Sequence, residues 1–192
     1  NNFKRAVNIT SGKDVTLVDT NGIILGTSTV SGTYDVTAAG DIIDYNALVI
    51  TGITTLEAGS GNDITLNTST NNFAAAVVIT SGNNVAITDE DAIDLGAATV
   101  SGTYSVTAGG AITDSGTQEI TGVTTLAAGS GNDITLDTST NNFAAAVGIT
   151  SGRNVAITDE DAIDLGAATV SGTYSVTAGG AVTDSGTQEI TG

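Results

Sequence analysis

The chain has 192 residues and a formal net charge of −17, from 21 acidic residues and only four Lys or Arg residues. Binding to nucleic acids or to anionic membranes requires clustered bases, so this charge disfavours both partners. The chain contains no Cys, Pro, Met, Trp or His, and its longest apolar runs fall far short of a membrane span, so we expect no membrane insertion. Hydrophobic residues still make up 40% of the chain, which predicts a folded core built from Val, Ile, Leu and Ala.

The sequence repeats with a period of 70 residues. The tripeptide NNF begins at residues 1, 71 and 141, which divides the chain into repeats 1–70, 71–140 and 141–192. The first two repeats agree at 44 of 70 positions, and the third matches the second except at Gly148, Arg153 and Val182. A fixed period of this kind indicates a solenoid, a propeller or an array of beads. The third repeat stops at residue 192, and we expect the chain to be a window from a longer array.

Short alternating segments follow one another within each repeat. In the second repeat they cover residues 76–80, 84–88, 92–96, 98–102, 104–108, 111–113, 118–122, 123–128 and 133–138. Apolar residues alternate there with Thr, Ser and Asn, which is typical of strands. The residues between the segments are mainly Gly, Asn, Asp and Ser, which favour tight turns.

Nine segments in each repeat divide into three rungs of three strands, where a rung is one full circuit of a coil. The sequence therefore predicts an all-β fold, a right-handed parallel β-helix with about three rungs per 70-residue repeat and about 23 residues per rung. We expect a single continuous β-solenoid over residues 1–192, with a truncated third repeat. The inward aliphatic columns would include Val85, Ile87, Ile93, Leu95, Val106, Ile134 and Leu136. The alternative is a string of 70-residue sandwich beads, but the chain has neither a linker nor an aromatic cluster to support a small core.

The stretch AAGSGNDITL at 127–136 resembles the calcium-binding nonapeptides of secreted toxins. In those nonapeptides the apolar residue lies two positions after the Asp, whereas Ile134 and Leu136 lie one and three positions after Asp133. The stretch also occurs only once in each full repeat, and calcium requires six to eight oxygen ligands. We therefore expect a tight Gly-Asn corner before a strand rather than a metal site.

Acidic residues concentrate in the stretch TDEDAIDLG at 88–96. The second repeat has Asp89, Glu90, Asp91 and Asp94, and the third has Asp159, Glu160, Asp161 and Asp164. The first repeat keeps only Asp19 of this cluster. Charged side chains in loops are usually solvated, so we expect a solvated acidic corner. The alternative is weak calcium binding along one edge of the coil.

The sequence offers no catalytic constellation. It has no His for general acid–base chemistry, no Cys nucleophile and no special loop that distinguishes one repeat from the others. We predict no catalytic residues, no cofactor-binding residues and no metal ligands, and a protein that is not an enzyme. Unpaired strand edges at the ends of a β-solenoid also make self-association possible.

Residues 71–116 resemble the repeats of filamentous-haemagglutinin-like surface adhesins of Gram-negative bacteria. The resemblance is in Asn71-Asn72-Phe73, then AITDEDAIDLG at 86–96, then VSGTYSVTAGGAIT at 100–113. It implies a long β-helix, exported by two-partner secretion or autotransport, that is released or displayed at the bacterial cell surface. It also implies host-cell, bacterial or polysaccharide surface ligands, although no binding residue can be transferred to this chain.

These observations lead to one expected function and two alternatives. We expect a structural stalk segment of a large secreted or cell-surface adhesin, in which the flanking repeats of the same chain are the immediate partners. The first alternative is a subunit of a self-assembling extracellular filament or matrix. The second is a polysaccharide-active β-helix enzyme, which would need two carboxyl groups at a defined separation.

Overall fold

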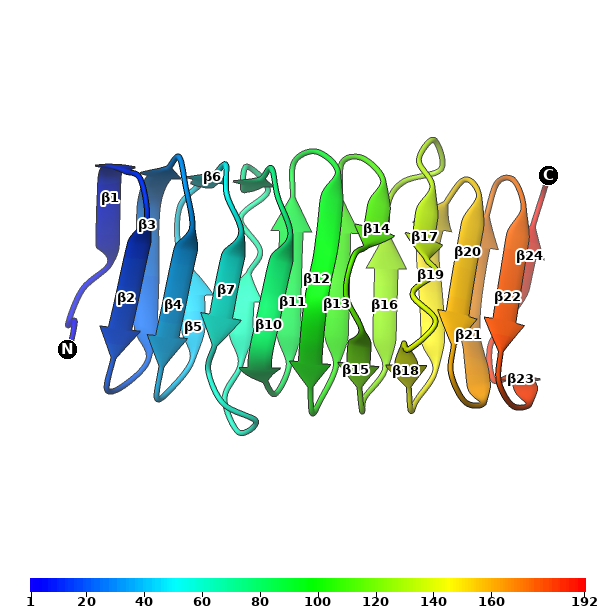
Figure 1. Ribbon diagram of the computed structural model, residues 1–192. Helices are drawn as coiled ribbons and strands as arrows, with labels where there is room; N and C mark the ends of the chain where they lie inside the picture. Colours follow the sequence, from blue (N-terminus) through cyan, green and yellow to red (C-terminus); the bar gives the residue numbers. More distant parts are fainter.

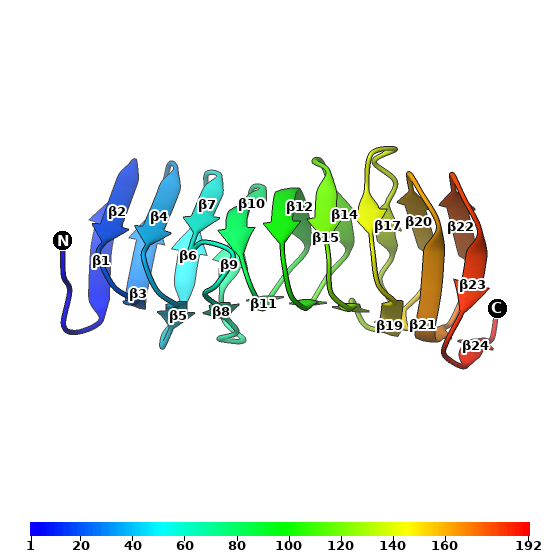
Figure 2. The same cartoon turned by 90° about the horizontal axis from the view of Figure 1, so that it is seen from below.

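The computed structural model describes residues 1–192 and consists of strands, corners and loops only. The strands stack along one axis, and the two termini lie at opposite ends of the resulting rod (Figures 1 and 2). In Figure 1 the front strands run downward and the strands behind run upward as the chain moves from left to right, so the coil is right-handed. The predicted right-handed parallel β-helix is confirmed. The coil has about nine rungs. This number is slightly larger than the one that 192 residues would give at the predicted 23 residues per rung. None of its segments is a helix long and apolar enough to cross a membrane.

The strands fall into three sets that follow the sequence repeats. The first repeat holds β1 (Val7–Gly12), β2 (Val15–Asp19), β3 (Ile23–Val30), β4 (Tyr34–Ala38), β5 (Ile42–Asp44), β6 (Leu48–Ile50), β7 (Thr54–Glu57) and β8 (Ile64–Leu66). The second holds β9 (Asn72–Phe73), β10 (Val77–Gly82), β11 (Val85–Asp89), β12 (Ile93–Val100), β13 (Tyr104–Ala108), β14 (Ile112–Asp114), β15 (Gln118–Ile120), β16 (Thr124–Ala127) and β17 (Ile134–Leu136). The third holds β18 (Asn142–Phe143), β19 (Val147–Gly152), β20 (Val155–Asp159), β21 (Ile163–Val170), β22 (Tyr174–Ala178), β23 (Val182–Asp184) and β24 (Gln188–Ile190).

Two long parallel sheets form the walls of the rod. Sheet A has 13 strands and includes, along its length, β3, β5, β8, β11, β13, β16, β19 and β21. Sheet B has 11 strands and includes β2, β4, β7, β10, β12, β14, β17, β20 and β22. Paired residues on neighbouring rungs are close in sequence, as in Val77–Leu95 and Thr54–Val77, and every strand pairing is parallel. Separate beads with antiparallel sandwiches are therefore excluded.

A short third side exists on only part of the coil. The eight-residue strand β12 bends near Gly96, so its first half pairs with β14 and its second half pairs with β15. β18 then continues the short side from β15. In the first repeat β3, β6 and β9 make the same arrangement. Most rungs thus consist of one strand in each wall and have a flat cross-section. The sequence predicted three strands in every rung, but a third strand occurs only where these long strands bend.

Successive repeats are related by half a rung. The equivalent strands β1, β10 and β19 lie in sheets A, B and A, and the equivalent strands β2, β11 and β20 lie in sheets B, A and B. Four successive pairings lead from β1 through β3, β5 and β8 to β11, which is the strand that directly follows β10. A repeat therefore takes about 3.5 rungs at roughly 20 residues each, close to the predicted number of about three rungs. The extra half rung places equivalent strands of successive repeats on opposite walls, which the sequence did not predict.

The interior is one aliphatic cluster of 40 buried residues, which extends from Leu17 to Val170. All seven side chains predicted to point inward are at most 1% exposed. Phe73, Phe143 and Tyr104 also lie in the core, each 1% exposed. Because inward and outward residues alternate along each strand, each rung contributes the same apolar layer between the two walls.

Candidate functional site

A buried carboxylate closes the corner that the sequence predicted to be solvated. Asp89 is 2% exposed, and its Oδ2 accepts a hydrogen bond from the backbone N–H of Phe73 at 2.9 Å. Its Oδ1 accepts a second bond from the N–H of Asp91, also at 2.9 Å. Asp159 makes the same two bonds with Phe143 and Asp161. The prediction of a solvated corner was therefore wrong for Asp89 and Asp159, although Glu90 and Asp91 beside them are exposed.

The structural role of Asp89 could have been predicted from the first repeat. Asp19 is the one acidic residue of the cluster that this repeat keeps, and it accepts hydrogen bonds from the N–H groups of Phe3 and Asn21. A residue shared by divergent repeats is expected to serve the fold, and Asp19 joins two rungs as Asp89 does. Glu90, Asp91 and Asp94 have no acidic counterpart in the first repeat and make no such backbone clasp.

The surroundings shift the pKa values of these carboxyls in different directions. Burial raises the pKa of Asp89 above its ordinary value, against the opposing effect of its two N–H donors, and the neighbouring Asp91 and Glu90 charges raise it further. Burial also acts on Asp19, but there the backbone N–H donors of Phe3, Asn21 and Thr20 lower its pKa. The three clasps share their geometry but not their electrostatic surroundings.

A second clasp explains the first Asn of the NNF tripeptide. Asn71 is fully buried, and its Nδ2 donates to Asp44 Oδ2 at 2.6 Å while its Oδ1 accepts from the N–H of Leu48 at 2.9 Å. Asn141 makes the same bonds with Asp114 and Gln118 in the next repeat. Asn141 therefore satisfies polar groups at the bend that leads into the short third side. The second Asn points outward, as shown by the bond from Asn72 Nδ2 to Asp91 Oδ2 at 3.0 Å.

The Gly-Asn corner is the tight turn expected from the sequence. Gly59 and Gly129 have φ angles of +82° and +81°, a region that residues with a side chain rarely adopt. Asp133 at the end of this corner is held by Arg153, whose Nε and Nη2 each donate at 2.8 Å. The hydrogen bonds from Arg153 hold the pKa of Asp133 well below its usual range. Nowhere in the structure do three carboxylates gather in an arrangement that could hold a metal ion.

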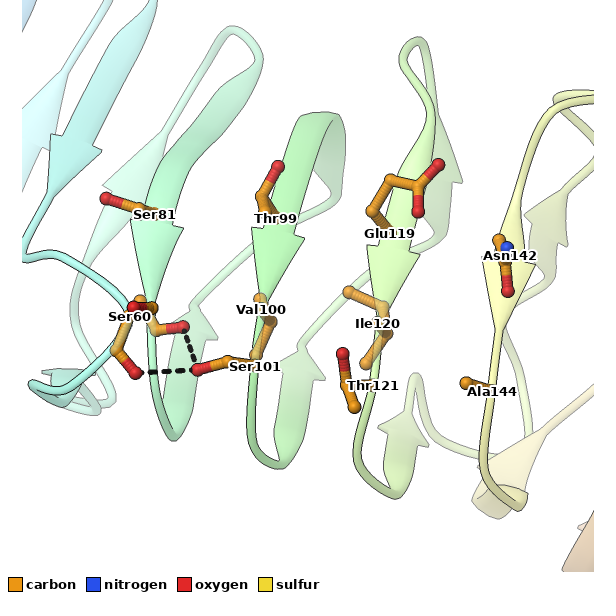
Figure 3. Close-up of a pocket in the computed structure, with 11 residues that line it drawn as sticks. Ser60, Ser81, Thr99, Val100, Ser101, Glu119, Ile120, Thr121, Asn142 and Ala144 are labelled. Atoms are coloured by element: carbon orange, nitrogen blue, oxygen red, sulfur yellow. Dashed lines mark hydrogen bonds between the residues drawn. The ribbon is translucent and has the colours of Figure 1, made fainter.

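A shallow groove of about 250 Å³ lies along the short third side formed by the end of β12, β15 and β18 (Figure 3). The hydroxyl of Ser101 closes one end of the groove by donating to the carbonyl of Ser60, two rungs away, at 2.8 Å. Glu119 is the only ionisable side chain in the lining, which otherwise consists of Ser60, Ser81, Gly82, Thr99, Val100, Ser101, Ile120, Thr121, Asn142 and Ala144. Hydrolysis of glycosides by two carboxyl groups requires a second acid, which the groove does not supply. Hydrogen bonding through hydroxyl groups is the chemistry that this lining offers.

A family model described as "Repeats of unknown function (DUF5649)" matches the chain three times, over residues 12–80, 82–150 and 152–192. The three matches begin at the same place in each repeat, so they reproduce the 70-residue period. No curated protein and no solved structure matches the chain.

The two neighbouring Asn residues of the NNF tripeptide should differ sharply in their effect on stability. Replacing Asn141 with Ala leaves the N–H of Gln118 and a carboxylate oxygen of Asp114 without their buried partner, so we expect a loss of about 2–4 kcal/mol in the free energy of unfolding. Asn142→Ala is the matched control, with an expected change within about 0.5 kcal/mol. Urea unfolding followed by circular dichroism measures both. Equal effects of the two substitutions would contradict the assigned clasp.

The pair formed by Arg153 and Asp133 should make stability depend on pH. A carboxyl with a lowered folded-state pKa stabilises the fold above its unfolded pKa of about 3.9, and this contribution is lost as the pH falls through the folded-state value. Arg153→Asn copies the residue that the second repeat has at this position, Asn83. We expect a small drop in melting temperature at pH 7 that shrinks below about pH 4 and in high salt, because the pair is exposed. A difference that grows as the pH falls would refute this interpretation.

Proposed function

We propose that this chain, which belongs to the family described as "Repeats of unknown function (DUF5649)", is a stiff rod segment of a large secreted or cell-surface bacterial adhesin. The observation that carries the proposal is the uninterrupted interior. A single cluster of 40 buried side chains passes through both repeat boundaries, and no linker separates one repeat from the next. A rod without a flexible joint holds its two ends at a fixed separation, and this is the property that a stalk requires.

Stiffness follows from the way the rungs are joined. The chain makes 116 backbone–backbone hydrogen bonds, and those between parallel strands run along the rod axis from rung to rung. Bending the rod would stretch these bonds on one wall and compress the side chains between the walls. The buried clasps of Asp89 and Asn71 add side-chain bonds across rungs at the corners, where the ladders of the walls are interrupted.

Extension by whole repeats supports a stalk rather than a compact binding domain. The third repeat differs from the second at three of the positions they share, so the surfaces at a repeat boundary are already matched. Adding or removing a repeat would change the length of the rod and leave its cross-section unaltered. The resemblance of residues 71–116 to filamentous-haemagglutinin-like repeats supports the extracellular setting and the role in adhesion.

Length should increase linearly with repeat number. Inserting a second copy of residues 71–140 after Thr140 adds about 3.5 rungs, or roughly 17 Å at the spacing of paired strands. We expect small-angle X-ray scattering to show this increase in maximum dimension with an unchanged cross-sectional radius. The same insertion with Asn141 and its inserted counterpart changed to Ala provides a weakened control. An increase in cross-section, or a flexible joint between repeats, would contradict the rod.

Display outside the cell can be tested on the organism that makes the protein. Antibodies raised against the 192-residue chain should label intact cells or the culture medium, and the labelling should disappear when the coding sequence for these repeats is deleted. The deletion strain should also attach less to surfaces or to other cells. Labelling that requires lysis of the cells would reject the extracellular role while leaving the rod itself unaffected.

A further inference from the structure

One wall of this acidic rod has no charged side chain pointing outward from seven consecutive strands, although Asp41 and Asp63 lie at its edge, directly before β5 and β8. Sheet A, the row of strands behind in Figure 1, shows this from β3 to β19. Pairing registers place its outward residues in two columns along the rod. The first column holds Ile24, Ile43, Thr65, Ala86, Ser105, Thr125 and Gly148, and the second holds Thr88, Thr107, Ala127 and Ser151, while Tyr45 and Asn67 directly follow β5 and β8. We call these residues the uncharged face.

The opposite wall is acidic. Asp35 on β4, Glu57 on β7 and Asp94 on β12 point outward from sheet B, and the exposed Asp137 directly follows β17. Thr37 and Ser115 donate hydrogen bonds to two of these carboxylates, but no Lys or Arg pairs with any of them. The two walls therefore differ in charge although they are built from the same repeat.

Identical repeats could not produce this difference. Because successive repeats are related by half a rung, each outward position of the first repeat appears on the other wall in the second. Asp35 and Glu57 of sheet B correspond to Ser105 and Ala127 of sheet A, and Asp94 of sheet B corresponds to Ile24 of sheet A. The substitutions at these three positions thus keep charges off the strands of sheet A and leave them on the strands of sheet B, whereas Asp41, next to β5 of sheet A, corresponds to the uncharged Ala111 next to β14 of sheet B.

The uncharged face also exposes apolar side chains at one end. Ile24 and Ile43 are register partners on β3 and β5, and both are partly exposed. Tyr45, which follows β5 directly, is 64% exposed. The second repeat has Asp94, Thr113 and Ser115 at these three positions, so the apolar group is particular to the first repeat.

We infer that the uncharged face of sheet A is an interface between two copies of this chain, packed wall against wall. With a net charge of −17, two copies repel each other over most of their surface, and sheet A is the wall whose strands put no carboxylate between the two copies, with Asp41 and Asp63 at its edge. Small outward residues also allow two sheets to approach to about 10 Å, the normal separation of packed sheets.

The area is sufficient for a specific dimer. Seven strands at about 4.8 Å by roughly 17 Å of strand length give on the order of 570 Å² per copy, or about 1,100 Å² in total. A biological interface should exceed about 1,000 Å². A two-fold pairing with the rods antiparallel would place the Ile24, Ile43 and Tyr45 group of each copy against the Thr and Ala columns of the other. The pairing depends on the face and not on where the rod is displayed, so its failure would leave the proposed stalk role untouched.

The chain itself supplies the substitutions for the test. Ser105→Asp with Ala127→Glu gives the uncharged face the residues that the first repeat has at these positions, Asp35 and Glu57, so the fold already accommodates them. Ser175→Asp makes the same local change on β22 of sheet B and is the matched control. Circular dichroism checks that both variants fold.

Sedimentation equilibrium of the 192-residue chain in 0.15 M salt should show a monomer–dimer equilibrium that strengthens with salt, because carboxylates such as Glu90 and Asp91 rim the wall. The double variant should dissociate at least tenfold more readily, and Ser175→Asp should match the unchanged chain. A chain that stays monomeric up to millimolar concentration overturns the inference. So does a dimer that both variants weaken equally, or one that neither weakens, which would indicate stacking through the ends of the rods.

Discussion

Each rung must return to hydrogen-bonding register with the rung before it, and this constraint determines the rest of the molecule. Parallel strands satisfy their backbone groups only through neighbours on adjacent rungs, so each circuit has to place a strand beside its predecessor. The paired segments achieve this with circuits of unequal length, as the pairs Val77–Leu95 and Thr54–Val77 illustrate. The extra residues of the longer circuits form the Gly-Asn corner and the short third side, while the walls keep their register.

Corners are where the ladder cannot satisfy all backbone groups, and there the chain uses buried Asp and Asn side chains. Asp89 accepts two backbone N–H groups where the NNF tripeptide passes, and Asn141 supplies both a donor and an acceptor at the bend before β15. An unsatisfied buried polar group costs about 1–3 kcal/mol, so these side chains matter more to the fold than their small number indicates. They also explain why an acidic chain places some of its carboxylates out of contact with water.

The sequence predicted what depends on period and alternation, and failed where a residue's role depends on its neighbours in space. Val85, Ile87 and Ile134 were placed in the core because alternation determines which face of a strand is buried. The half rung per repeat could not be read from the sequence, because it depends on whether β12 bends within a rung or spans one wall. The burial of Asp89 was missed because an acidic neighbourhood favours solvation, while the partner that buries it, Phe73, lies 16 residues earlier and on another rung.

The half rung also limits what a repetitive rod can display. In an array of identical repeats, any outward side chain alternates between the two walls, so it recurs on one wall only at every second repeat, about seven rungs or roughly 34 Å apart. A continuous surface of one character therefore requires neighbouring repeats to differ. The first two repeats do differ in this way, and the nearly identical third repeat ends the uncharged face by bringing Asp164 onto sheet A. Divergence between repeats in this family can thus have a functional reason: it is the means by which a coil with half a rung per repeat gives one wall a surface of its own.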